Sequence, residues 1–419
     1  MSHSIADFSR RPDGADWKTA RSRVKSRIIA LAGATALAAG LAGCGQTIGN
    51  PFGGDSGQAE PPPAAPQAAA PGSTLGTGPV RVGLLLPLTQ GGAPSAVGTS
   101  LKNAAELAIS DTGGTAVTLL VKDTGGSAGG ARDGAQAAIR EGAQMIIGPL
   151  FAGSVRAAGS VARGAGKPVI AFSTDTSVAA RQVYLLSFLV ENEVARVVEY
   201  AASKGKRSIA VLAPQTSYGS VAAGAVQQAA AARGMRIAVL ERYSGSPSAA
   251  AQRIGAAAGT FDTLFVPDQA QNMAGLSSLL ISAGVDPNKV LVMGTGLWND
   301  ARTMNLPLLQ GAVFAAPENA GFNAFADRYR SKFNSDPTRI ATLAYDAVTL
   351  AVALAGQQSA NKFPESILTN ASGFNGADGL FRFRSDGTNQ RGLAVQQIRR
   401  GTTSTVSGAP RSFSGRSGT

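Results

Sequence analysis

The side chains that most often carry enzyme chemistry are scarce in this chain. Its only cysteine is Cys44 and its only histidine is His3. The sequence from Cys44 onward therefore has no histidine, which excludes Ser-His-Asp and Cys-His catalysis, proton transfer by imidazole, and ordinary zinc or iron sites. Carboxylate chemistry and a calcium site of oxygen ligands stay open on composition, but no spaced acidic pair emerges. The sequence predicts a non-catalytic protein with no metal and no cofactor.

Cys44 follows a segment typical of an export signal. A basic stretch, Arg21–Arg27, precedes the fourteen largely apolar residues Ile28–Leu41. Fourteen residues are too few to span a bilayer comfortably, but they match the apolar region of a signal peptide. We therefore predict that residues 1–43 are a signal peptide.

The residues that end this segment predict a lipid anchor on Cys44. Leu41-Ala42-Gly43-Cys44 resembles the lipobox of bacterial lipoproteins, in which small residues fit the signal peptidase and the thiol accepts a diacylglyceryl group. Each buried CH₂ of such a lipid contributes roughly 0.8 kcal/mol to membrane attachment. Gly45, rather than Asp, follows the cysteine, which in similar lipoproteins favours the outer membrane. The predicted location is the periplasm, with the chain lipid-anchored to the cell envelope.

Two segments lack the pattern of a folded domain. After Cys44, residues 45–78 are mostly Gly, Pro, Ala, Ser and Gln, and they have no periodic apolar face. Such a segment cannot bury enough surface to fold, so we expect 44–78 to be a lipidated linker. Residues 401–419 are similar in composition and are expected to form a flexible tail.

Net charge and motifs exclude nucleic-acid and nucleotide chemistry. The formal charge is +12; residues 1–43 hold seven of the 38 basic and three of the 26 acidic residues, which leaves 31 and 23 and a charge of +8. This charge is scattered, and no basic run interleaved with aromatic residues follows residue 43, so no nucleic-acid partner is expected. The Gly-rich segments 123–130 and 164–168 lack the spacing of a phosphate-binding loop.

Residues 79–400 have the alternating pattern of an α/β fold. Short apolar runs, typical of strands buried on both faces, alternate with segments of helical periodicity. Such alternation predicts parallel sheets joined by right-handed crossovers. Two series of strands favour two doubly wound parallel-sheet lobes, and the competing topology is a (β/α)₈ barrel. The expected strands are 80–87, 117–122, 145–148 and 168–172 in the first series and 208–213, 236–240, 263–267 and 290–294 in the second.

The two series give approximate boundaries for the lobes. The chain is expected to cross into the second lobe near 183–193, and helices at about 323–333 and 341–355 are expected to return to the first. The ending, 379–388 and 392–398, predicts a terminal hairpin. We therefore expect lobe I at about 79–187 plus 318–375, and lobe II at about 188–317 plus 376–400.

The predicted ligand site lies beyond the carboxyl ends of the strands, where helix N-termini in open parallel sheets offer free N–H groups. Hydroxyls and N–H groups there would hold a ligand carboxylate, and an Asp would hold an ammonium group. Aromatic rings would pack against the apolar part of a ligand. The residues selected on this basis are Gln90, Phe151, Ser154, Ser173, Thr174, Asp175, Tyr218, Asp268 and Trp298.

Several of these residues also have an ordinary structural explanation. Ser154 and Asp268 stand where helix N-caps are favoured whatever the ligand. Asp123 also follows a strand, but we expect it to brace its Gly-rich turn. Trp298 is either a ligand contact or part of the core. The run Ser173-Thr174-Asp175 is the preferred ligand-binding segment.

A series of short motifs resembles the type I periplasmic binding proteins of the leucine-binding class. The order and spacing match over roughly residues 79 to 400. The resemblance implies two α/β lobes joined by three crossings, with a ligand in the cleft between them. The motifs are Val82-Gly-Leu-Leu-Leu-Pro-Leu-Thr89, Ile147-Gly-Pro-Leu150, Lys167-Pro-Val-Ile-Ala-Phe-Ser173, Tyr218-Gly219 and Gly379-Leu-Phe-Arg-Phe383.

This resemblance implies a solute receptor for ABC-type uptake of an amino acid or similar small polar ligand, with an ABC permease as partner. Two departures from the amino-acid binders stand out. Ala152 occupies the place of a Ser or Thr that holds the ligand's carboxylate, and Thr174-Asp175 replaces an Ala-Thr pair. The segments 186–194 and 213–219 also resemble lipoproteins that activate penicillin-binding proteins. The alternative function is therefore regulation of a peptidoglycan synthase from the outer membrane.

Overall fold

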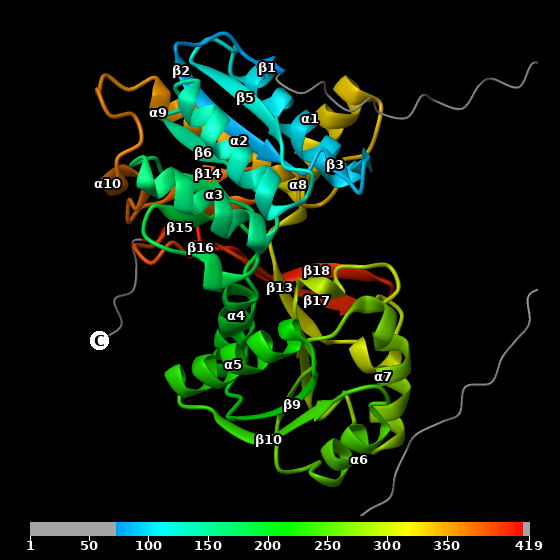
Figure 1. The fold of residues 1–419 in the computed structure, drawn as a ribbon. Coiled ribbons are helices and arrows are strands. Elements are labelled where there is room, and N and C mark those ends of the chain that lie inside the picture. The colour runs from blue at the N-terminus through cyan, green and yellow to red at the C-terminus, as the bar shows by residue number, and fades with distance from the viewer. Residues whose placement is uncertain (1–72, 414–419) are drawn as a thin grey trace, which may run out of the picture. The chain divides into compact units, whose positions relative to one another are not determined.

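A computed structural model describes residues 73–413, which form two α/β lobes (Figure 1). The chain passes between the lobes at 186–189, 317–318 and 392–393. Two lobes with three crossings agree with the expectation from the sequence. The predicted signal peptide, Cys44 and most of the predicted linker lie outside the described residues.

Lobe I contains the elements β1 (Thr74–Leu75), β2 (Val80–Leu86), α1 (Ala96–Asp111), β5 (Val117–Asp123), α2 (Ala128–Arg140), β6 (Met145–Ile147), α3 (Ala152–Gly164), β7 (Val169–Ala171), β8 (Val183–Leu185), α8 (Asn319–Phe333), α9 (Ala341–Ala355) and α10 (Glu365–Leu368). The sheet order is β1-β5-β2-β6-β7-β8, and only β1 is antiparallel. In β2, Val82 and Leu84 pack with α1 and α9, whereas Leu85 packs with α2 and α3. This alternation follows from the two-residue repeat of a strand, and it explains why β2 is apolar on both faces.

Lobe II contains α4 (Val190–Ser203), β9 (Ser208–Pro214), α5 (Ser217–Ala232), β10 (Arg236–Tyr243), α6 (Ser248–Ala256), β11 (Thr263–Phe265), α7 (Ala270–Ser282), β12 (Leu291–Gly294), β13 (Val313–Ala316), β17 (Ala394–Arg399) and β18 (Thr402–Ser407). The sheet order is β10-β9-β11-β12-β13-β17-β18. In β9, Ala210 and Leu212 pack in the core with α6 and α7, and Ile209 and Val211 pack with α4 and α5. Two open sheets of this kind exclude the (β/α)₈ barrel.

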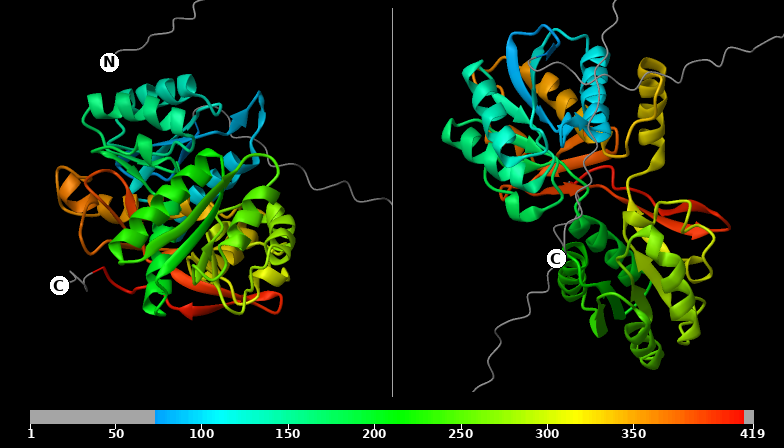
Figure 2. Two further views of the ribbon diagram at one scale, coloured as in Figure 1. Left: turned by 90° about the horizontal axis from the view of Figure 1, so that it is seen from below. Right: turned by 45° about the vertical axis from the view of Figure 1, so that its right-hand side comes forward.

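The C-terminal strands correct two expectations. β17 pairs with β13 and β18, so the predicted hairpin between 379–388 and 392–398 is wrong. The expectation of a flexible tail from residue 401 is wrong as well, because 402–407 form β18 at the edge of the lobe II sheet (Figure 2). This strand consists almost entirely of Thr and Ser and has no apolar alternation, so its pairing could not be predicted from the sequence.

A small sheet places residues 374–391 with lobe I, beyond the boundary expected at 375. It consists of β14 (Phe374–Gly376), β15 (Gly379–Phe383) and β16 (Asn389–Arg391). Phe381 and Phe383 are buried in the same core cluster as β2 and α9. This core burial determines the lobe to which the segment belongs.

Buried charges and rings connect the crossings. Arg391 Nε and Asn389 Nδ2 both donate to the carbonyl oxygen of Ser187, at 3.0 and 2.8 Å. The Arg391 guanidinium lies 4.7 Å from the ring centroid of Phe188, and the Arg339 guanidinium lies 4.8 Å from the same ring. These contacts tie the first crossing to the third, and cation–π attraction in a desolvated setting strengthens them.

Gly294, at the end of β12, lies against the buried ring of Trp298. A Cβ atom on Gly294 would lie 2.3 Å from Trp298 Cε2. Gly294→Ala is therefore expected to overpack lobe II and lower the free energy of unfolding by roughly 1–3 kcal/mol, measured by urea denaturation.

The matched control for this substitution is Gly275→Ala on α7 of the same lobe, where a Cβ atom would meet nothing within 4 Å. Alanine is a better helix former than glycine, so this variant should be neutral or slightly stabilised. Equal destabilisation by both substitutions would show that the Trp298 contact does not constrain the lobe.

Candidate ligand-binding site

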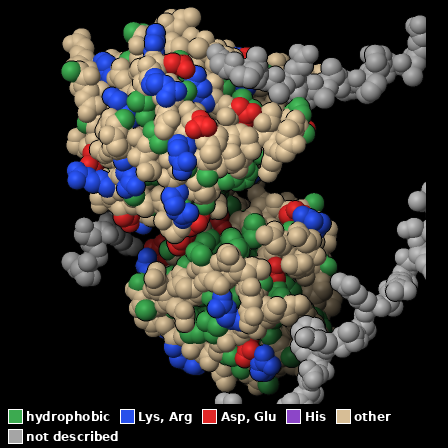
Figure 3. Space-filling model, viewed as in Figure 1, with side chains coloured by type: hydrophobic (Ala, Val, Ile, Leu, Met, Phe, Trp, Pro, Cys, Tyr) green, Lys and Arg blue, Asp and Glu red, His purple; other side chains and the backbone are tan. Residues whose placement is uncertain are grey.

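Strand order places the candidate site in each lobe. The first parallel strand, β2 or β9, lies between the second, β5 or β10, and the third, β6 or β11. The connections on the two sides of the first strand therefore diverge, and in open α/β sheets ligands bind at such a switch point, beyond the carboxyl ends of the strands. Figure 3 shows the surface drawn in between the lobes, with acidic and hydrophobic side chains gathered there.

On lobe I, two predicted residues lie together after β2 and β6. A Cβ atom on Gly126 would lie 3.5 Å from Phe151 Cε2 and 3.6 Å from Gln90 Cγ, so these side chains flank the same glycine. Phe151 is 36% exposed, which is high for a phenylalanine. It stands directly before α3, whose first turn has no side-chain cap. The structure thus presents an aromatic ring beside free helix N–H groups.

The hydroxyls predicted on lobe I differ in availability. Ser154 is buried and donates to the Ser127 carbonyl oxygen at 3.1 Å, so it joins α3 to the start of α2. Ser173 Oγ is buried and accepts from the backbone N–H of Asp175. The Asp175 carboxylate accepts from the Ser177 N–H and caps the short helix Thr176–Val178. Thr174 is exposed between them.

Asp123 has the bracing role that its turn predicted. Its Oδ1 accepts from the backbone N–H groups of Leu88, Thr89 and Gly125 at 2.8–3.1 Å. Its Oδ2 accepts from the Thr89 hydroxyl at 2.6 Å. Burial alone would raise the pKa of this carboxyl, but the four donors together hold it below its usual range. Both oxygens are committed to fixing the turn after β2.

On lobe II, two hydrogen bonds of polar side chains connect α4 and α5 with the segment after β12. Tyr218 Oη donates to Thr295 Oγ1 at 2.8 Å, which links α5 to the residue after β12. Glu193 Oε2, on α4, accepts from the backbone N–H of Gly296 at 2.9 Å. Tyr218 was predicted as a ligand residue; Glu193 and its neighbour Glu191 were not. Their signal in the sequence is the run Glu191-Asn-Glu193 just after the first crossing, where only a lobe boundary was predicted.

Two carboxylate oxygens of lobe II are buried without a donor. Asp268 is 2% exposed; its Oδ1 accepts from Gln269 N–H at 2.6 Å and Asn272 Nδ2 at 2.8 Å, but its Oδ2 has no partner. Glu191 Oε1 accepts from the Thr176 hydroxyl of lobe I at 3.0 Å, and its Oε2 has no partner. A buried acceptor without a donor costs on the order of 1–3 kcal/mol, so these oxygens favour a cationic donor.

Trp298 lies in the core rather than at the surface. Its ring has no exposed area and packs in the cluster that contains Leu264, Met273 and Phe314. Of the two explanations that the sequence left open for this residue, the geometry shows core packing. The indole Nε1 has no hydrogen-bond partner among the described residues.

Burial controls protonation in this part of lobe II. Desolvation raises the pKa of Glu193 to about 8, against lowering effects of the Gly296 N–H and the charge of Arg339. Burial also raises the pKa of Tyr218, and the nearby carboxylates of Glu193, Glu191 and Asp268 add to the effect. The Tyr218 hydroxyl therefore keeps its proton at any physiological pH, and Glu193 is mostly protonated at pH 7.

Residues 73–413 have no group of three or more His, Cys, Asp or Glu side chains placed to hold a metal ion. None of the helices in this part of the chain combines the length and apolar character needed to cross a bilayer.

A family model decides what kind of protein this is. Residues 79–403 match the model described as "Periplasmic binding protein". The chain belongs to this periplasmic binding protein family. Its members are solute-binding proteins rather than enzymes, and the match spans both lobes. No protein with a curated description matches the sequence significantly.

The chain aligns with nearly the whole length of several solved structures of the same fold. A putative branched-chain amino acid ABC transporter from Rhodospirillum rubrum is 20% identical, with a TM-score of 0.69 over 78% of this chain and 99% of its own. A branched chain amino acid ABC transporter periplasmic ligand-binding protein from Burkholderia xenovorans is 19% identical, with a TM-score of 0.64 over 80% and 97%. An ABC transporter substrate-binding protein from Desulfitobacterium hafniense in complex with Leu is 19% identical, with a TM-score of 0.59 over 78% and 99%.

The buried Glu193 carboxyl predicts a pH dependence of stability. Its pKa is about 8 in the folded protein against an ordinary 4.5. Between these values the folded protein keeps a proton that the unfolded chain loses, so the free energy of unfolding falls as pH rises and levels off above 8. Glu193→Gln keeps an acceptor for Gly296 N–H and removes the titration. From pH 5 to pH 8.5 the wild type should lose at least about 1.4 kcal/mol more than the variant in urea unfolding.

Burial also raises the pKa of Asp346 to about 7, so the stability of both the wild type and Glu193→Gln falls with pH for this second reason. The test is therefore the difference between the two proteins in the loss of unfolding free energy. Parallel stability profiles for wild type and variant would contradict the assignment of a protonated Glu193.

Proposed function

We propose that this protein is the solute receptor of an ABC-type uptake system and that it binds an amino acid or a similar small zwitterion between its lobes. The single observation that carries the proposal is the buried, donor-free Oδ2 of Asp268 at the switch point of lobe II. A ligand ammonium group supplies the missing donor and the opposite charge.

The charged groups on the two sides are complementary to a zwitterion. Lobe II provides carboxylate oxygens of Asp268 and Glu191, and the Tyr218 and Thr295 hydroxyls lie between the ends of β9 and β12. Lobe I provides the uncapped first turn of α3 and the exposed Thr174 hydroxyl, which are donors suited to a carboxylate. The helix N-terminus compensates for Ala152, which cannot supply a hydroxyl.

Phe151 and Gln90 suit the remaining part of such a ligand. The half-exposed ring of Phe151 provides apolar contact area for an aliphatic or aromatic side chain. The named relatives support this class of ligand, because two are described as branched-chain amino acid proteins and a third is in complex with Leu.

Asp268→Asn tests the proposal directly. The amide can still accept from Gln269 N–H, but it no longer offers a charge to an ammonium group. Amino acids that raise the melting temperature of the wild type should bind the variant roughly tenfold to a hundredfold more weakly, as measured by calorimetric titration.

The control is Asp286→Asn, which lies in the same lobe but before β12, at the amino end of that strand. Asp286 accepts a backbone N–H from Asn288, as Asp268 accepts one from Gln269, so both substitutions keep an acceptor for a backbone donor. Affinity should be unchanged in this control. If no amino acid shifts the wild-type melting temperature, the uptake proposal fails. Retention of a penicillin-binding protein on the immobilised chain would then favour the regulator of peptidoglycan synthesis.

We also propose that Cys44 carries a lipid and anchors the protein to the outer membrane. The basic stretch, the apolar stretch and the sequence Leu41-Ala42-Gly43-Cys44 support this anchor. Cys44→Ser removes the acceptor thiol, so the variant should move from the detergent phase to the aqueous phase in detergent partitioning of cell extracts. Ser4→Ala, within the predicted signal peptide, is the control and should partition like the wild type. An unmodified Cys44 by intact mass measurement would contradict the anchor.

A further inference from the structure

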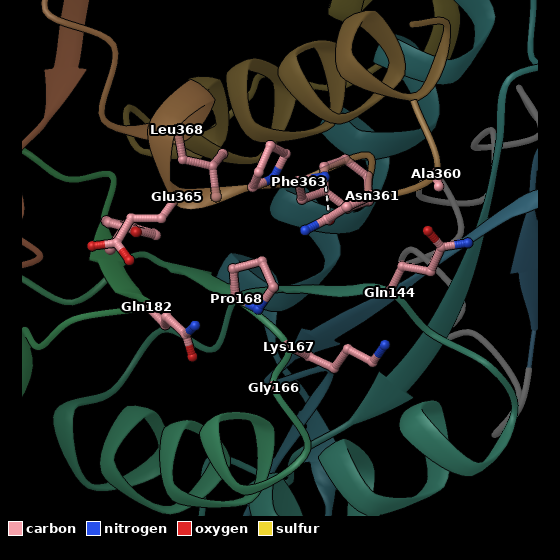
Figure 4. A pocket seen from close by; sticks show the side chains of 12 residues that line it. Gln144, Gly166, Lys167, Pro168, Gln182, Ala360, Asn361, Phe363, Glu365 and Leu368 are labelled. Carbon is pink, nitrogen blue, oxygen red and sulfur yellow. Dashed lines mark hydrogen bonds between the residues drawn. The ribbon is translucent and has the colours of Figure 1, made fainter. Parts of the chain in front are cut away.

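Lobe I contains a cavity of about 480 Å³ at the opposite edge of its sheet from the candidate ligand site (Figure 4). Gln144, Lys167 and Gln182 lie on its wall, and each stands just before a strand, β6, β7 or β8 respectively. The proposed zwitterion site lies beyond the carboxyl ends of the same parallel strands. The cavity is therefore a separate site, and its volume falls in the range of small-molecule sites, roughly 300–1,000 Å³.

The other wall comes from a distant part of the sequence. Residues 360–365, after α9, and Leu368 of α10 lie across from the strand ends, as Figure 4 shows. Asn361 Oδ1 accepts from Phe363 N–H at 3.2 Å, which fixes the amide on this wall. Glu365 forms an ion pair with Arg181 at 2.8 Å, which neutralises its charge. The lining is thus preformed and mixed in character, with amides beside the apolar Phe363 and Leu368.

Several polar groups of the lining have no partner in the described chain. The Tyr184 side chain has no exposed area, and its hydroxyl makes no hydrogen bond. Its ring packs 5.3 Å from Phe383 in the core, and its hydroxyl is close enough to Glu365 for that charge to affect its pKa. Burial raises the pKa of this hydroxyl to about 12, so it keeps its proton, and it lies behind the lining rather than in the open cavity.

Lys167 gives the cavity its net charge. It is half-buried, and it forms no ion pair with any described residue, whereas the Glu365 carboxylate is already paired. The amide side chains of Gln144 and Gln182 form no hydrogen bond with residues 73–413, so their donors and acceptors are free for a ligand. One free cation and three amides in a cavity of this size match a ligand with several hydroxyls and a single negative charge.

We propose that this cavity binds a sugar acid, a small polyhydroxylated molecule with one carboxylate. The carboxylate pairs with Lys167, and the amides of Gln144, Gln182 and Asn361 hydrogen-bond the hydroxyls. Tyr184, Phe363 and Leu368 are buried behind these side chains and support the wall without contacting the ligand. The site is independent of the proposed zwitterion site.

Glucuronate and glucose are the probes that test this proposal, since they share a pyranose ring and differ in the carboxylate. Calorimetric titration of the full chain should show one saturable glucuronate site, with glucose binding at least about tenfold more weakly. Lys167→Gln should abolish the preference for glucuronate. Gln144→Ala should weaken both sugars while the melting temperature stays near that of the wild type.

Lys206→Gln is the matched control, because Lys206 also follows a glycine after a helix and precedes a strand, but in lobe II. This variant, like Asp268→Asn, should bind glucuronate as the wild type does. The proposal is overturned if neither sugar binds saturably, if Lys167→Gln retains the preference, or if Asp268→Asn or a saturating amino acid abolishes glucuronate binding. The last result would place the sugar between the lobes instead.

Discussion

The order of the strands is the constraint on which the rest of this molecule depends. In both lobes the first parallel strand, β2 or β9, lies between the second and third, so the connections on its two sides run in opposite directions. Parallel strands end together, and residues after β2 and β6 or after β9 and β12 are thereby brought to one edge of each sheet. Gln90 and Phe151 come together on lobe I in this way, and Tyr218 and Thr295 on lobe II.

Burial then gives the two lobes different chemistry. Lobe II holds carboxyl groups out of water, with Glu193 mostly protonated and Asp268 short of one donor. Lobe I faces the same region with hydroxyls and an uncapped helix. The crossings join them through Arg391, which is held between the rings of Phe188 and Phe381 and bonded to the Ser187 carbonyl oxygen. The proposed site, with separated charges on lobes joined in this way, suits a zwitterion.

Much of this fold could be predicted from the sequence, because short apolar runs such as 80–86 and 208–213, alternating with segments of helical periodicity, are typical of strands buried on both faces. Asp268 and Tyr218 could be selected from the sequence for the same reason, since each follows such a run. Three features could not be predicted from the sequence. Glu191 and Glu193 act from a helix after a crossing, the burial of Trp298 depends on a contact with Gly294, and β18 pairs through its backbone with little apolar signal. Each depends on tertiary contacts that local periodicity does not encode.

Native mass spectrometry of the gently purified protein, before and after incubation with the common amino acids, tests the central claim most directly. The account predicts a complex with one small molecule per chain, with a mass that fits an amino acid or a similar zwitterion and that is lost on denaturation. A chain that keeps its bare mass with every amino acid would contradict a ligand site between the lobes.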